Sequence, residues 1–486
     1  MRRVLGRRQF LVSGTGLVGA SLLAACGQAV SPTPTQAPKP AEAPKPAAAP
    51  TPTPAPAAAA QPTPTPVILS VTGKGKVELL WQMSATDAWI RASVGELPKL
   101  LEKVPSIGKV TVQPTPDDWI NKLVAAMVAG TAPDVFDMWG DIMPPFVERG
   151  QVVDVQPLVN KDYTADDLKD FYPWQWRDFV MPWLNNIRFG MPRYVNIMFT
   201  WYNKDMFDKA GVKYPDLNWT HDDYAEAARK LTVKDSSGKV QTAGLAYPAW
   251  SWDRYWYKPV IWGGHTVDPA DNTKCVFDSD QSLAAFEWSR KLMWDEKAML
   301  QPLDIQRQAF RLHFPTGRMA MAEDGFYPFE MDEAIQGKIR WAYAHTPKGP
   351  TGQRKVLGTT DGAAIWKGTK NLDQAWELCK WIAGPENQNA ILTATGRCPV
   401  RFSVLAKLEE HDTKARPNLK DANVGIVREA MEMGYPSGRE FFKDNNAARE
   451  IIDPALEKVF IVGGTPVSYF KEIAQQVTEA QRKGRR

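Results

Sequence analysis

Short apolar runs alternate with amphipathic stretches along most of the chain. The run "VELLWQMSA" from Val77 breaks into small polar residues, a pattern typical of a strand that enters a loop. In the next amphipathic stretch Trp119, Leu123 and Met127 recur near helical spacing, and Gly130 follows as a stop signal. The first elements of the folded part are therefore a predicted strand and a predicted helix.

The same alternation continues to the C-terminus. Further strands are predicted at residues 135–136, within 196–212 and at 242–250, and helices at 282–299, 371–396 and 466–483. Strands that alternate with helices predict an α/β fold with largely parallel sheets, whose ligands bind beyond the carboxyl ends of the strands. The loops at residues 82–87 and 137–141 are therefore the first candidates for a site.

The N-terminal residues predict an export signal. The pair Arg7-Arg8 precedes a short apolar run, which favours a signal peptide at residues 1–25 over a membrane-spanning helix. Leu-Ala-Ala-Cys-Gly around Cys26 resembles a bacterial lipobox, so Cys26 is predicted to be lipidated and to become the mature N-terminus. The paired arginines resemble a twin-arginine signal. The general export route, and a plain signal with Cys26 incidental, stay open as alternatives.

Residues 26–66 are predicted to form a tether after the lipidated cysteine. They are dominated by Pro, Ala and Thr, so burial cannot offset the entropy cost of ordering them. Polyproline II structure would make them a semi-rigid spacer. The remaining cysteines, Cys275, Cys379 and Cys398, match no metal-site spacing and are expected to be buried or free thiols.

Length and composition limit the class of protein. A chain of 486 residues exceeds what one hydrophobic core usually organises, so two or more globular units are expected. Hydrophobic residues make up 44% and charged residues 23%, which excludes wholesale disorder and a multi-span membrane protein. The formal charge of +4 falls to near zero (4 − 4) without the four arginines of residues 1–25. We therefore expect no nucleic-acid partner.

The stretch "AWSWDRYWYKPVIWGG" at residues 249–264 crowds aromatic rings together, in a chain with 19 Trp. Helix core, membrane belt, base-stacking platform and sugar-stacking platform are the alternatives. A membrane belt lacks a spanning segment, and base stacking lacks a basic groove. Helical spacing predicts that Trp256 and Trp262 face a core. A pyranose has one apolar face and a rim of hydroxyls, so other rings of the stretch suit a sugar.

Several stretches together resemble one family. "KLVAAMVAGTAPDVFDMWGDIMPPF", "YNKDMFDKAGVKYPDLNWTHDDYAEAARKLT", "HFPTGRMAMAEDGFYPF" and "TDGAAIWKGTKNLDQAWELCKWIAGPENQ" occur in this order. They resemble segments of the family 1 extracellular solute-binding proteins, and the resemblance covers residues 75–485. Asn218, where a proline commonly precedes the Trp-Thr helix start, departs from the family pattern, as does the larger aromatic content.

The resemblance implies an α/β fold of the type II periplasmic-binding-protein class, with two lobes that are each a sheet flanked by helices. Lobe I would comprise residues 67–192 and 359–398, and lobe II residues 193–358 and 399–486. The chain would cross between the lobes near residues 190–194, 357–361 and 396–401. Closure of the lobes would be a hinge motion selected by the ligand.

The resemblance also implies positions that contact a ligand in the cleft. Two aromatic pairs lie where maltose-binding members place rings, and an aromatic residue with a carboxylate follows a Pro-Asp turn. Polar side chains at the first strand end and at two crossings could bind hydroxyl groups. The predicted ligand-binding residues are Trp139, Asp141, Trp250, Trp252, Phe326, Tyr327, Gln82, Ser84, Asp361 and Arg397.

Motifs for chemistry are missing from the sequence. No HExxH, GxSxG or Walker-type loop occurs, so we expect no enzyme activity, no metal and no cofactor, and ATP hydrolysis would belong to a partner. Asp134, Asp137 and Asp141 form a carboxylate cluster, and a glycosidase needs two carboxyls about 5 to 9 Å apart. Asp134, however, belongs to a Pro-Asp turn with a structural explanation.

The predicted function is capture of a carbohydrate by a monomeric lipoprotein on the outer face of the bacterial cytoplasmic membrane. The protein would deliver the solute to the permease subunits of an ATP-binding-cassette importer. One alternative is the same role for a glycerophosphate or a polyamine. A second is a secreted carbohydrate-active enzyme.

Overall fold

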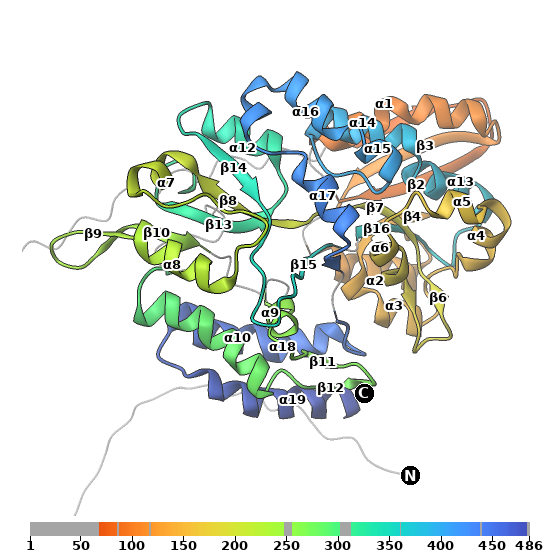
Figure 1. Cartoon of the computed structure of the whole chain (residues 1–486). Helices are drawn as coiled ribbons and strands as arrows, with labels where there is room; N and C mark the ends of the chain where they lie inside the picture. The colour runs from red at the N-terminus through yellow and green to blue at the C-terminus, as the bar shows by residue number, and fades with distance from the viewer. Residues whose placement is uncertain are drawn as a thin grey trace, which may run out of the picture. The chain divides into compact units, whose positions relative to one another are not determined.

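Two sheets with helices packed on them organise the part of the chain that the structure describes (Figure 1). The computed structural model describes residues 68–483 except 85–86, 116–117, 247–254, 302–312, 360 and 438–439, and of Asp141 it describes the backbone alone. The predicted α/β fold, with sheets flanked by helices, is confirmed.

The six-stranded sheet has the order β1-β3-β2-β4-β16-β7. Its strands are β1 (Leu69–Thr72), β2 (Val77–Met83), β3 (Ile107–Pro114), β4 (Val135–Trp139), β7 (Met191–Tyr194) and β16 (Asp361–Ile365). Strand β2 is parallel to β3 and β4, whereas β16 is antiparallel to both β4 and β7. Successive residues of β4 enter different cores: Val135 packs in one apolar cluster and Phe136 in another, so both faces are covered.

The five-stranded sheet has the order β14-β8-β13-β10-β9. Its strands are β8 (Met198–Asn203), β9 (Val233–Lys234), β10 (Val240–Ala246), β13 (Met319–Gly325) and β14 (Trp341–Ala344). Only β10 and β13 run parallel among its pairs; the others are antiparallel. The prediction of largely parallel sheets is therefore wrong for both sheets. Strands such as β16 arrive after the chain has crossed from the other sheet, and they enter against the direction of their neighbours.

Helices cover these sheets, and α8 beside β10 is one example in Figure 1. The helices are α1 (Asp87–Lys103), α2 (Trp119–Ala129), α3 (Pro144–Glu148), α4 (Gln156–Asp162), α5 (Ala165–Leu168), α6 (Pro173–Asp178), α7 (Lys204–Ala210), α8 (His221–Leu231), α9 (Tyr257–Ile261), α10 (Asp280–Arg290), α12 (Pro328–Ile335), α13 (Leu372–Ile382), α14 (Pro385–Thr395), α15 (Phe402–Leu405), α16 (Leu408–Ala415), α17 (Ile426–Met433), α18 (Asn445–Leu456) and α19 (Phe470–Lys483). Short strand pairs complete the described part: β5 (Val180–Met181) with β6 (Ile187–Arg188), β11 (Val267–Asp268) with β12 (Asp271–Cys275), and β15 (Val356–Leu357) with β17 (Pro436–Ser437).

Local sequence signals set several helix ends. Gly130 ends α2 with a φ of 74°, a left-handed conformation that glycine adopts without strain. Thr220 begins α8 with a capping box to Asp223. The predicted helix at 371–396 is two helices, because Pro385 has no N–H to continue the first and instead starts α14.

The described part of the aromatic stretch belongs mainly to a core. Trp256 is 2% exposed, which confirms its predicted position, whereas Trp262 is only partly buried and packs against His221. Helix α9 is only five residues long, shorter than the predicted spacing implied. All three predicted thiols, Cys275, Cys379 and Cys398, are free and buried, as expected.

The chain passes between the sheets near two of the predicted crossings. Strand β7 belongs to the six-stranded sheet and β8 to the five-stranded sheet, so the chain crosses between Tyr194 and Met198. After β15, the chain enters the six-stranded sheet again at Asp361 in β16. The assignment of whole segments to two lobes stays a prediction.

Candidate functional site

Three neighbouring strands place three side chains in one row of the six-stranded sheet. In the register of β16, Asp361 lies opposite Trp139 of β4 on one side and opposite Tyr194 of β7 on the other. Cross-strand partners project from the same face of a sheet, so the three side chains share a face. Trp139 is 38% exposed, whereas Asp361 and Tyr194 are 3% and 8% exposed. The row therefore offers one open aromatic ring beside a carboxylate.

Hydrogen bonds tie the two chain crossings to each other next to this row. The Asn196 N–H donates to Thr359 Oγ1 at 2.8 Å, and the Thr359 N–H donates to the Asn196 carbonyl at 2.9 Å. The Asn196 side-chain amide donates to the Tyr327 hydroxyl, and its oxygen accepts from the Phe326 N–H at 2.9 Å. Asn196, which lies just before β8, therefore connects both crossings with the residues that follow β13.

Arg397 joins Tyr194 of the six-stranded sheet to residues that follow β13 in the chain. Its Nη1 donates to the Tyr194 hydroxyl at 2.9 Å, and its guanidinium carbon lies 4.8 Å from the centroid of the Tyr327 ring. The guanidinium also forms an ion pair with Glu330 of α12. Burial raises the pKa of Tyr194, so its hydroxyl stays protonated and accepts this hydrogen bond as a neutral group.

A buried cluster next to the row, on the same face of the sheet, supports it. Asp137 is 1% exposed; its Oδ1 accepts from Trp81 Nε1 at 2.9 Å, and its Oδ2 accepts from the Ser84 N–H at 2.8 Å. Arg193 pairs with the same carboxylate at 3.1 Å and lies over the Trp89 ring, 4.5 Å from its centroid. Burial raises the pKa of Asp137 to about 6, and the Arg193 charge opposes that shift. Trp89 in turn packs edge-on against Tyr194, with ring centroids 4.8 Å apart.

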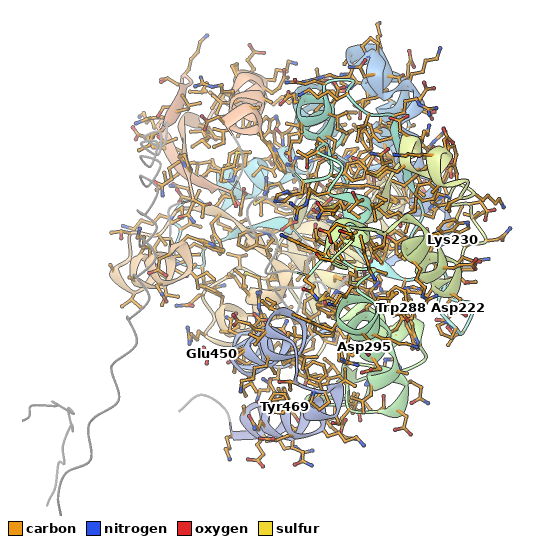
Figure 2. All side chains as sticks on the ribbon, turned by 90° about the vertical axis from the view of Figure 1, so that its left-hand side faces the viewer. Asp222, Lys230, Trp288, Asp295, Glu450 and Tyr469 are labelled. Carbon is orange, nitrogen blue, oxygen red and sulfur yellow. The ribbon has the colours of Figure 1, made fainter. Side chains whose placement is uncertain are left out.

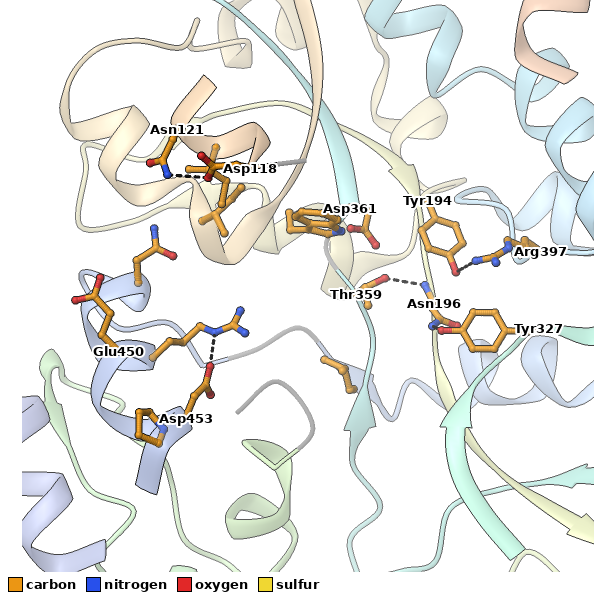
Figure 3. A pocket seen from close by; sticks show the side chains of 17 residues that line it. Asp118, Asn121, Tyr194, Asn196, Tyr327, Thr359, Asp361, Arg397, Glu450 and Asp453 are labelled. Carbon is orange, nitrogen blue, oxygen red and sulfur yellow. Dashed lines mark hydrogen bonds and ion pairs between the residues drawn. The ribbon is translucent and has the colours of Figure 1, made fainter. Parts of the chain in front are cut away.

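The row, the crossings and Arg397 line a cavity of about 940 Å³ (Figure 3). This volume lies at the upper end of the ~300–1,000 Å³ typical of small-molecule sites. The lining residues are Asp118, Ile120, Asn121, Trp139, Ile142, Tyr194, Asn196, Tyr327, Leu357, Thr359, Asp361, Arg397, Asn446, Arg449, Glu450, Asp453 and Pro454. Charged and amide side chains outnumber aromatic rings among them, so the cavity offers both hydrogen-bonding groups and apolar surface.

Of the predicted ligand-binding residues, Trp139, Tyr327, Asp361 and Arg397 line the cavity. Gln82 and Ser84 do not line the cavity, and Gln82 is buried. The Ser84 N–H donates to Asp137, and the Ser84 carbonyl accepts from Arg193. Phe326 is 1% exposed and packs against Phe199 and Tyr343 in the core.

Trp250, Trp252 and the side chain of Asp141 lie outside the described residues. Contact of any of these residues with a ligand stays a prediction.

Other lining residues were missed from the sequence. Asn446, Arg449, Glu450 and Asp453 recur at helical spacing on α18, and this polar stripe was a signal that could have identified them. Asp118 and Asn121 flank the start of α2, where the Asn121 amide donates to Asp118 at 2.7 Å. Tyr194, Asn196 and Thr359 carried no comparable signal, because only the tertiary structure brings their segments together.

The carboxylate cluster of the Pro-Asp region has structural contacts. Asp134 accepts from the Leu80 N–H at 2.9 Å and from the Thr369 hydroxyl, and so ties β4 to its neighbours. Asp137 pairs with Arg193 next to the row and does not line the cavity. Within the described ranges, no three His, Cys, Asp or Glu side chains are grouped in a way that could hold a metal ion. Across the same ranges, no helix has the length and apolar character that a membrane crossing requires.

Comparison with protein families finds one model that matches. The family described as bacterial extracellular solute-binding protein matches residues 85–389, which span well over half of the chain. A binding protein of Brucella abortus is 23% identical over 367 residues, which are 76% of this chain and 84% of that protein. A maltooligosaccharide ABC transporter solute-binding lipoprotein of Streptococcus pneumoniae is 23% identical over 325 residues, 64% of this chain and 70% of that protein.

Solved structures show the same fold at low sequence identity. An ABC substrate-binding protein of Listeria monocytogenes in complex with cycloalternan has a TM-score of 0.69 and 22% identity, and the match covers 83% of this chain and 98% of that one. A maltose-bound MalE3 of T. maritima has a TM-score of 0.65 and 19% identity, with 83% and 100% covered. The two-lobed binding-protein fold expected from the sequence is therefore confirmed.

Proposed function

Because the chain belongs to the family of bacterial extracellular solute-binding proteins, we propose that it captures a carbohydrate in the cavity beside Trp139. The observation that carries this proposal is the row of Trp139 and Asp361. The exposed face of the indole suits the apolar face of a pyranose, and the carboxylate next to it can accept hydrogen bonds from the hydroxyl rim. The relatives that bind maltooligosaccharide, cycloalternan and maltose support the same class of solute.

The proposal includes delivery of the solute to a membrane importer. Cys26 would carry the lipid anchor after removal of residues 1–25, and residues 26–66 would form the tether. The protein would act as a monomer and pass its solute to the permease subunits of an ATP-binding-cassette transporter, without chemistry of its own. The Streptococcus relative, a lipoprotein of such a transporter, supports this arrangement.

A hinge motion between two lobes would accompany capture. Lobe I would comprise residues 67–192 and 359–398, with lobe II made of residues 193–358 and 399–486. The hydrogen bonds between Asn196 and Thr359 lie at two of the proposed crossings, so they can hold the hinge segments together while the cavity opens and closes. Closure would exclude water and strengthen each hydrogen bond to the solute.

Thermal unfolding of the purified chain with a panel of solutes tests the proposal. The panel contains mono- and oligosaccharides, glycerophosphates and polyamines, and a solute that binds only the folded state raises the melting temperature. We expect a dose-dependent rise with one sugar series, which is lost in Trp139→Ala and kept in Trp183→Ala, whose ring does not line the cavity. Trp250→Ala tests the second predicted platform in the same assay.

Two results would contradict the carbohydrate assignment. A rise with a glycerophosphate or polyamine alone would leave a binding protein with another solute. Release of shorter products from an oligosaccharide, followed by chromatography, would show an enzyme in place of a binding protein.

A further inference from the structure

Helix α18 turns a polar face toward the cavity. Asn446, Arg449, Glu450 and Asp453 recur at positions i, i+3, i+4 and i+7, and all of them line it. The opposite face of the helix, which includes Ala448, Ile452 and Ala455, is buried in the core. The core therefore fixes the rotation of α18, and with it the direction of the polar face.

This face borders the wall that carries Trp139, and both line the same cavity. The short helix η1 (Gly140–Ile142) directly follows Trp139 and contacts α18. Figure 3 shows Glu450 on one side of the cavity with Asp118 and Asn121 on the other. A ring stacked on Trp139 would thus present its hydroxyl rim toward α18.

The side chains of this face differ in what they can offer a solute. Arg449 forms an ion pair with Asp453 at 3.2 Å, one turn along the helix, which compensates its charge and fixes its direction. Glu450 is exposed, and Figure 2 shows it on α18. A carboxylate can accept hydrogen bonds from two neighbouring hydroxyl groups, and an amide such as that of Asn446 can both accept and donate. Bonds to the ionised carboxylate are the stronger kind.

On the basis of the proposed carbohydrate-binding function, we infer that the polar face of α18 determines which sugar the protein accepts. Glu450 and Asn446 are its specificity-determining residues, and they bind adjacent hydroxyl groups of the solute whose ring stacks on Trp139. Stacking on Trp139 discriminates little between sugars, because many pyranoses have an apolar face. The hydroxyl pattern at α18 is selective, because a sugar that lacks one of these hydroxyls cannot form the matching hydrogen bond.

Calorimetric titration of the purified chain with the sugar that gives the largest thermal shift, and with its deoxy and epimeric analogues, tests this inference. Glu450→Ala and Asn446→Ala are each expected to weaken binding of the parent sugar about 10- to 100-fold. In these variants the analogue that lacks the matching hydroxyl binds no more weakly than the parent sugar does. Glu457→Ala is the matched control, since it removes an exposed glutamate seven residues along the chain that does not line the cavity.

The outcomes separate this inference from the proposed function. If the wild-type chain binds no saccharide, the proposed function fails and the inference fails with it. If the wild-type chain binds a saccharide and both alanine variants keep its affinity and the order of the analogues, only the inference is overturned. An equal loss for every sugar, with the order of the analogues kept, would also overturn it, because it would indicate a structural role for α18.

Discussion

Two buried ion pairs, one at each sheet, differ in how well hydrogen bonds from neighbouring residues stabilise the carboxylate. Asp137 and Arg193 lie next to the candidate site in the six-stranded sheet, with side chains 1% and 4% exposed and 3.1 Å apart. Lys258 and Glu323 lie beside the five-stranded sheet, 2% and 1% exposed and 3.0 Å apart. In distance and burial the two pairs are alike.

Their hydrogen bonds are not alike. Both oxygens of Asp137 accept hydrogen bonds, from Trp81 and from the Ser84 N–H. Glu323 accepts from Lys258 through Oε2, and its Oε1 has no hydrogen-bond partner among the described residues. Burial raises the pKa of Asp137 to about 6 but that of Glu323 to about 8, and it lowers the pKa of Lys258 to about 7.

The difference teaches that hydrogen bonds, more than distance to the partner, keep a buried carboxylate charged. With a pKa of about 6, Asp137 is mostly ionised at neutral pH, and it connects to Tyr194 through Arg193 and Trp89. Glu323 and Lys258 can lose their charges near neutral pH because burial disfavours both ions. The first pair is therefore part of the support of the candidate site, whereas the second is a buried pair of low electrostatic gain.

The largest expected effect comes from breaking the first pair. Arg193→Met leaves the Asp137 carboxylate buried without its counter-charge, so we expect a loss of about 3–5 kcal/mol in the free energy of unfolding at pH 7. Urea denaturation measures it. A loss below about 1 kcal/mol would show that Trp81 and Ser84 alone keep the carboxylate stable.

The pH dependence of stability should sharpen the contrast. Because the pKa of Glu323 is raised from 4.5 to about 8, its stabilising contribution is complete below pH 4.5 and is lost as pH rises to 8. For Asp137 the same loss spans only pH 3.8 to about 6. We expect Glu323→Gln to reduce the fall in unfolding free energy between pH 6 and 8, as urea titrations at several pH values would show. An unchanged slope in that window would mean that Glu323 is ionised throughout it.

The pH dependence of stability due to Lys258 has the opposite sign to that due to Glu323. Its pKa is lowered from 10.5 to about 7, so its contribution is complete above pH 10.5 and is lost as pH falls to 7. In the wild-type chain this effect opposes the decline due to Glu323 only above pH 7. The window from pH 6 to 7 therefore separates Glu323 from Lys258, and the Glu323→Gln variant separates it from Asp412, whose pKa burial also raises to about 8.

Replacing both members of each pair by apolar residues should separate the pairs further. Lys258→Met with Glu323→Leu removes two desolvation costs, so we expect a change of no more than about 1 kcal/mol, or a gain. Asp137→Leu with Arg193→Met leaves the Trp81 and Ser84 donors without an acceptor and should cost about 1–3 kcal/mol for each. Both double variants can be compared by thermal and urea unfolding. Equal losses in the two would refute the distinction drawn from the hydrogen bonds.

An exposed pair gives the smallest expected effect and a baseline for the buried ones. Arg229 is 50% exposed and pairs with Glu296 at 2.6 Å on the surface of the five-stranded half. Solvent screens this pair, so Arg229→Met should lower the unfolding free energy by less than about 1 kcal/mol, and less still in high salt. A larger loss that salt does not reduce would indicate packing by the arginine stem in place of charge.

The sequence predicted the fold class through local signals. The spacing of Trp119, Leu123 and Met127 and the stop at Gly130 predict α2 closely, because these signals act within one helix. The break at Pro385 was overlooked, although proline at that position forbids a continuous helix. Strand direction was predicted wrongly, because the residues of a strand such as β16 do not indicate which strand it pairs with or in which direction.

The residues of the candidate site were likewise predicted only in part. Trp139 and Tyr327 were predicted from resemblance, and both line the cavity, whereas Phe326, one residue earlier, points into the core. Successive residues at a strand end face opposite sides, and sequence spacing alone does not say which side is the cavity. Asn196 and Thr359 meet only because two crossings lie together.

The sequence by itself determined the class of fold, the family, the expected export signal and tether, and the presence of rings and carboxylates suited to a sugar. These follow from local periodicity and from motifs, which short segments carry whole. Only the tertiary structure decided that Trp139, Asp361 and Tyr194 share a row, and that the polar face of α18 lines the same cavity. The physical reason is that register between strands and the rotation of a packed helix are set by long-range contacts, which no single segment contains.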